Sequence, residues 1–71
     1  MRKREKYAAL FNETVALMRE YMKREMPQSF AAVFGLFKEL MKTCEILKIK
    51  MGNVDDLYEY AKKEEIEQFG F

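Results

Sequence analysis

Apolar residues in the first third of the chain recur with the spacing of an α-helix. At about 100° per residue, the apolar side chains and one threonine between positions 7 and 22 fall in one continuous arc of roughly 160°. In order around the helix they are Leu17, Leu10, Tyr21, Thr14, Tyr7, Met18, Phe11, Met22 and Val15. The opposite side is mainly polar, so the pattern predicts an amphipathic helix over about residues 4–25.

A single proline separates this helix from a second apolar pattern. Pro27 has no amide hydrogen and disfavours the α conformation of Met26, so the first helix is expected to end near Glu25. A turn follows, with either Ser29 as N-cap or Pro27 as the first residue of the next helix. The alternative is one long helix kinked at Pro27. The hairpin is favoured, because a kinked rod would leave both apolar arcs without a local partner.

The middle of the chain carries the most apolar helical pattern. A second arc of roughly 160° contains Leu36, Leu47, Leu40, Val33, Met51, Cys44, Phe37, Phe30, Met41 and Phe34, again in order around the helix. We expect a helix over about residues 29–51, ended by Gly52 in the left-handed C′ position.

A shorter third helix is predicted over about residues 54–64. Asn53 is a suitable cap, and Asp55 and Asp56 lie where the helix dipole favours negative charge. Its apolar side is limited to Val54, Leu57, Tyr58, Tyr60 and Ala61. Residues 65–71 are expected to form a flexible tail that ends in Phe69 and Phe71. The whole chain, residues 1–71, therefore reads as one all-α domain: a hairpin of two long amphipathic helices plus a short third helix.

The apolar arcs are wider than a two-helix contact requires. A stripe of about 100° is enough for such a contact, whereas each long helix offers nearly half a cylinder. A second copy of the chain is the simplest additional cover, giving a homodimer in which two hairpins form a four-helix bundle. The residues predicted for self-association are Tyr7, Phe11, Met18, Met22, Phe34, Phe37 and Met41. The alternative is a monomeric three-helix bundle with some exposed apolar surface.

Residue types argue against catalysis and against a metal or cofactor. The chain has no histidine and one cysteine, Cys44, so the usual zinc sites and the Cys-His and Ser-His-Asp mechanisms are not expected. Cys44 lies inside the apolar arc, where desolvation makes a thiol a poor nucleophile. No glycine-rich phosphate loop is present in the sequence. We therefore expect a protein that is not an enzyme and that holds no metal and no cofactor.

Segment lengths and the single cysteine indicate a cytoplasmic protein. The longest apolar run, residues 30–37, is far shorter than the ~20 residues that cross a bilayer as a helix. The first apolar stretch, residues 7–11, is interrupted before it could form the core of a signal peptide. A free thiol suits a reducing compartment.

Charge is unevenly distributed along the chain. Residues 1–25 carry seven basic and four acidic side chains, whereas residues 54–71 carry two and six. The basic end suggests a small nucleic-acid-binding regulator that contacts phosphates through Arg2, Lys3, Arg4, Arg19, Lys23 and Arg24. A solvated terminus is the simpler explanation of these charges, so this function stands second.

The favoured function is a small non-enzymatic helical protein that self-associates and binds another protein. It would act as an adaptor, an inhibitor or a regulatory subunit. An aromatic pair on a flexible end can dock on a partner, so Phe69 and Phe71 are the predicted partner-binding residues.

Overall fold

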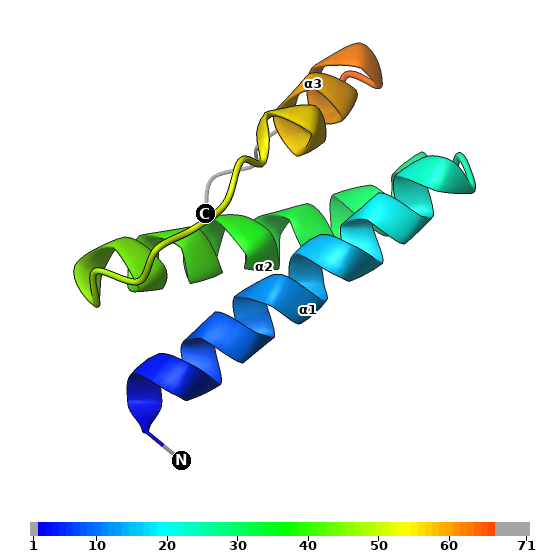
Figure 1. Cartoon of the computed structure of the whole chain (residues 1–71). Coiled ribbons are helices and arrows are strands. Elements are labelled where there is room, and N and C mark those ends of the chain that lie inside the picture. The colour runs from blue at the N-terminus through cyan, green and yellow to red at the C-terminus, as the bar shows by residue number, and fades with distance from the viewer. Residues whose placement is uncertain (1, 67–71) are drawn as a thin grey trace.

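Two long antiparallel helices and one short helix make up the fold. The computed structural model describes residues 2–66. Helix α1 spans Lys3–Lys23, α2 spans Pro27–Ile46 and α3 spans Asp55–Lys63, and the described residues contain no strand. Helices α1 and α2 pack along each other as a hairpin, and α3 lies across one side of it (Figure 1). The predicted all-α hairpin with a short third helix is confirmed, and the kinked rod is wrong.

At the start of α2 the structure has the expected proline, whereas the N-cap of α3 is Val54 rather than the expected Asn53 and makes no side-chain capping bond. Pro27 is the first residue of α2, where its missing amide hydrogen leaves no bond unmade. Ser29 therefore lies within the helix and does not cap it. Before α3, the side-chain oxygen of Asn53 accepts a hydrogen bond from the Asp55 amide at 2.8 Å.

All three helices end in the same way, on a residue other than glycine in the left-handed conformation. These residues are Glu25, Lys48 and Glu65, with φ of 53°, 57° and 55°. In each case the next amide bonds the carbonyl five residues back: Met26 to Tyr21 at 2.9 Å, Ile49 to Cys44 at 2.8 Å and Ile66 to Ala61 at 2.9 Å. This is the Schellman arrangement.

The end of α2 corrects the expected role of Gly52. The helix stops at Ile46, and Lys48 takes the left-handed position assigned to Gly52 from the sequence. A left-handed conformation costs roughly 1–2 kcal/mol for a residue other than glycine. Ile49 packs against the core in the position that follows, and this burial offsets the cost. Gly52 belongs to the connection between α2 and α3, where nothing lies within 4 Å of the space that a Cβ would occupy.

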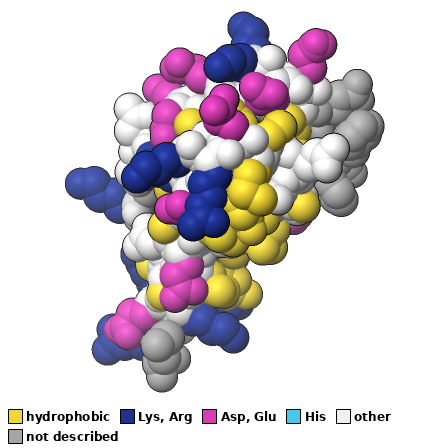
Figure 2. All heavy atoms as spheres, turned by 90° about the vertical axis from the view of Figure 1, so that its right-hand side faces the viewer, with side chains coloured by type: hydrophobic (Ala, Val, Ile, Leu, Met, Phe, Trp, Pro, Cys, Tyr) yellow, Lys and Arg dark blue, Asp and Glu magenta, His cyan; other side chains and the backbone are white. Residues whose placement is uncertain are grey.

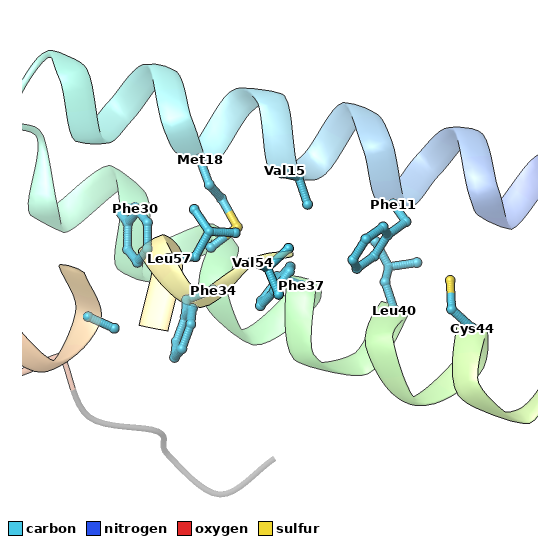
Figure 3. Packing of buried hydrophobic residues seen from close by; sticks show 11 residues of the cluster. Phe11, Val15, Met18, Phe30, Phe34, Phe37, Leu40, Cys44, Val54 and Leu57 are labelled. Carbon is cyan, nitrogen blue, oxygen red and sulfur yellow. The ribbon is translucent and has the colours of Figure 1, made fainter. Parts of the chain in front are cut away.

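A ladder of phenylalanines on α2 forms the centre of the core (Figure 3). Phe30, Phe34 and Phe37 are at most 2% exposed, and successive rings stack with centroids 5.7 and 5.9 Å apart. Phe11 of α1 stacks on Phe37 at 5.7 Å. We call Phe30, Phe34 and Phe37 the Phe ladder, and it joins the two long helices.

Helix α3 covers the Phe ladder from the other side. Tyr60 meets Phe30 edge-on at 4.8 Å, and Tyr58 meets Phe34 edge-on at 5.8 Å. Leu57 and Ala61 of the same helix are 0% and 3% exposed. The short helix thus closes the core within one chain.

We predict that Phe37→Ala unfolds the protein or leaves it barely folded. Phe→Ala in a core costs about 3–5 kcal/mol, which equals the whole stability expected of a domain of this size, about 3–5 kcal/mol. Ile46→Ala is the matched control, because Ile46 lies on the same helix and is 79% exposed. Urea unfolding followed by circular dichroism measures both variants. Equal midpoints for the two would contradict the central role of the Phe ladder.

Candidate interaction surface

The α1–α2 hairpin has two faces, and α3 covers only one of them. On α1, Arg19 reaches α3 through Asp56, and on α2, Phe34 touches α3 through Tyr58. Residues two apart on a helix lie about 200° apart, on nearly opposite sides. Leu17, two before Arg19, and Leu36, two after Phe34, therefore both lie on the side away from α3.

Three exposed leucines occupy this uncovered side, which we call the open face. Leu10 and Leu17, seven residues apart on one side of α1, are 38% and 43% exposed, and Leu36 of α2 is 56% exposed. Tyr21 and Val33, one turn from Leu17 and Leu36, are half-buried. Hydrophobic side chains also reach the surface between charged ones on the side shown in Figure 2. These leucines are three of the five large hydrophobic side chains that are exposed in the described residues, and the other two are Met26 and Ile46.

The residues predicted for self-association lie elsewhere. Four of them, Phe11, Met18, Phe34 and Phe37, are at most 3% exposed within a single chain. The other three, Tyr7, Met22 and Met41, are half-buried and pack against the same core. The four buried residues are therefore not available to an interface between folded chains, whereas the three half-buried ones can contribute only in part. Leu17, Leu10 and Leu36 lie at one edge of the two predicted arcs, but Val15 and Phe34, at the opposite edges, are buried, so an edge position alone does not mark an exposed residue.

Two of the arginines assigned to nucleic-acid contact form ion pairs with carboxylates of the same chain. The Arg19 guanidinium donates to both carboxylate oxygens of Asp56, at 2.9 and 3.1 Å, and to the Asn53 carbonyl at 3.0 Å. The hydrogen bond from Arg19 lowers the pKa of Asp56. Arg24 pairs with Glu20 at 2.8 Å along α1. Arg19 therefore fastens the start of α3 to α1.

Basic residues from two distant segments gather at one end of the molecule. The Arg4 guanidinium donates to the Lys48 carbonyl at 3.1 Å, so the connection after α2 lies beside the start of α1. The basic end, as we name it, comprises Arg2, Lys3, Arg4, Lys6, Lys48 and Lys50, all exposed. Lys23, at the far end of α1, lies outside this group. The predicted phosphate-binding residues thus do not form one patch.

Cys44 and Tyr58 are two ionisable side chains that the core of the described residues desolvates. Cys44 is fully buried, and desolvation raises the pKa of its thiol. The Tyr58 hydroxyl donates to the Met41 sulfur at 2.9 Å, and desolvation, followed by the charge of Glu45, raises its pKa. Across residues 2–66, no three Cys, Asp or Glu side chains come together as a metal site. Nor does that part of the chain contain a helix long and apolar enough to cross a membrane.

Phe69 and Phe71, predicted to bind a partner, lie outside the described residues. Comparison with protein-family models, with curated proteins and with solved structures finds no match for this chain. The proposals below therefore rest on the residues and their geometry.

We predict that Arg19→Gln raises the pKa of Asp56 and loosens α3. The pKa of Asp56 is lower in the folded chain than the unfolded value of about 3.9, so the pair stabilises the fold above that pH. This stabilisation is lost as the pH falls through the folded pKa. Because both side chains are nearly half exposed, the loss at neutral pH should be at most about 1 kcal/mol. NMR titration of Asp56 and urea unfolding at pH 7 and pH 3 measure these effects.

Arg24→Gln is the matched control, since it removes an ion pair of the same type that lies within α1 alone. It should leave the Asp56 titration unchanged. An Asp56 pKa that stays low in Arg19→Gln would show that Arg19 does not hold α3.

Proposed function

We propose that this protein is a small non-enzymatic helical protein that self-associates through its open face and acts by binding another protein. Its role would be that of an adaptor, an inhibitor or a regulatory subunit. The observation that carries the proposal is the open face, where Leu10, Leu17 and Leu36 stay exposed although the core is closed. A cytoplasmic setting, in which Cys44 stays reduced, fits this role.

Burying the exposed leucines of the open face would contribute to dimer formation. Fully burying a leucine stabilises by about 1.5–3 kcal/mol. Scaled by the exposed fractions of these three leucines, a dimer that buries six such side chains gains on the order of 5 kcal/mol. That gain must also offset the lost freedom of two chains, so we expect a moderate affinity.

The proposed protein partner binds outside the open face. In a dimer built on that face, α3 and its charged residues stay on the outside of each copy. Phe69 and Phe71 remain the proposed contacts with the partner.

We predict that Leu17→Glu weakens self-association without unfolding the chain. A carboxylate at the centre of an apolar interface loses its hydration, and Leu17 is exposed enough to tolerate the change in a monomer. Light scattering across a dilution series should show the wild type moving toward twice 8.5 kDa at high concentration. The variant should stay near 8.5 kDa with the same circular dichroism spectrum.

Ala16→Glu is the matched control for added charge on α1. Ala16 is exposed and lies two residues before the buried Met18, on the side of α1 away from α2. It should associate as the wild type does. A wild type that stays at 8.5 kDa at every concentration would overturn the self-association proposal.

A second candidate function is binding of a nucleic acid at the basic end. The contact between Arg4 and Lys48 favours it, because it joins two basic segments into one surface. A cluster of this kind attracts phosphates and releases their counterions. Under this proposal, Lys48 and Lys50 join the N-terminal residues, while Arg19 and Arg24 keep their places in ion pairs.

We predict for this second function that Lys48→Ala with Lys50→Ala weakens binding to duplex DNA and reduces its salt dependence. Each lost phosphate contact lowers the slope of log affinity against log salt by roughly 0.9. Lys62→Ala with Lys63→Ala removes the same charge from α3 and is the control. Fluorescence anisotropy at several salt concentrations measures both. Equal effects of the two variants would leave only nonspecific attraction and would remove this candidate.

A further inference from the structure

The alignment of the two long helices along their axes shows which residues of α1 lie level with Leu36. Height below means position along these axes. Phe11 and Phe37 stack, so they lie at one height, and Lys23 ends α1 shortly before Pro27 begins α2. The helices run in opposite directions with the same rise of about 1.5 Å per residue. Leu36 therefore lies level with about residues 12–14 of α1, between the heights of Leu10 and Leu17.

Helix α1 presents a hole at that height on the open face. Residues at i, i+3, i+4 and i+7 frame the hole that accepts a side chain from a packed helix. Here they are Leu10, Glu13, Thr14 and Leu17, and the two leucines lie about 10.5 Å apart along the axis. Thr14 is buried, and its hydroxyl donates to the Leu10 carbonyl at 2.7 Å. The base of the hole thus has no unpaired polar group, and Glu13 is the one charge at its rim.

We propose that a second copy of the chain docks on the open face with Leu36 of each copy in the Leu10–Leu17 hole of the other. This inference rests on the proposed self-association and specifies its geometry. Rotation about a two-fold axis parallel to the helices keeps the position of every residue along that axis. Leu36 of each copy therefore meets the Leu10–Leu17 hole of the other copy, and the two contacts are equivalent. Each α2 then faces the partner's α1 in antiparallel orientation, and both α3 helices lie on the outside.

The area available agrees with a second copy as the occupant. A specific interface buries about 800 Å² on each partner, which is roughly 15% of the 5347 Å² surface of this chain. One face of a two-helix hairpin, with helices about 30 Å long and axes 8–10 Å apart, offers an area of this order. The hole and the side chain that fills it are both present in one chain, so no other protein is needed to complete the fit.

The competing arrangement has its two-fold axis perpendicular to the helices. It places α1 against the partner's α1 and α2 against the partner's α2. Leu36 then lies near the partner's α2, far from Glu13. The charge of Glu13 therefore distinguishes the two geometries.

The test is a charge exchange across the interface, with mass measured by light scattering on the full chain. In the proposed geometry, Leu36→Glu places a carboxylate beside Glu13 of the other copy, so the dissociation constant should rise roughly 100-fold or more. Adding Glu13→Lys to that variant gives each new carboxylate a cation and should recover at least roughly tenfold of the loss. Within one chain, Glu13 lies two residues before the buried Val15, on the side away from the core. Glu13→Lys should therefore leave the fold of a single chain intact.

Each outcome decides between the proposals. Recovery by the double variant, with Glu13→Lys alone still dimeric, supports the geometry. Loss of the dimer in Leu36→Glu without recovery overturns this geometry and leaves self-association through the open face standing. A monomeric wild type overturns both the geometry and self-association.

Discussion

The structure depends on one constraint: the Phe ladder of α2 must be covered from two directions. Phe11 of α1 stacks on one end, and Tyr58 and Tyr60 of α3 close the other side. Without α3 the hairpin would leave Phe34 beside water. A nine-residue helix with little stability of its own is thus held in place by the aromatic surface that it covers.

The same constraint explains the unusual helix ends. Three residues other than glycine adopt positive φ, and each is followed by an apolar residue, Met26, Ile49 or Ile66, whose amide bonds back to the end of the helix. Ile49 and Ile66 pack against the core, and each adds apolar contact to a domain whose buried surface is small. Arg19 acts in the same direction, since its bonds to Asp56 and Asn53 fix where α3 begins.

The sequence was sufficient to predict the hairpin, because Pro27 and two broad arcs of helical period leave few other arrangements. It also located α3 closely, through Asn53 and the paired aspartates. It could not predict which edge of each arc α3 would cover, because periodicity gives the width of an apolar surface and not the direction of its partner. Most self-association residues were therefore placed toward the centres of the arcs, where Phe11 and Phe37 in fact meet each other, while Phe34 and Met41 lie at the edge that α3 covers. The prediction that Gly52 ends α2 was wrong for a related reason. Glycine is the commonest left-handed residue, yet the burial of Ile49 decided where α2 ends.

The closed core changes what self-association would mean for this protein. If the central arc residues formed the dimer interface, folding and association would be one event, and a single chain would be unfolded. With Phe11, Met18 and Phe37 buried in one chain, each copy of the proposed dimer would fold first and would then join through residues that the fold does not need. Association of that kind depends on concentration. Such a protein can exist as a monomer and as a dimer under the same conditions, which suits an adaptor or a regulatory subunit more than a permanent scaffold.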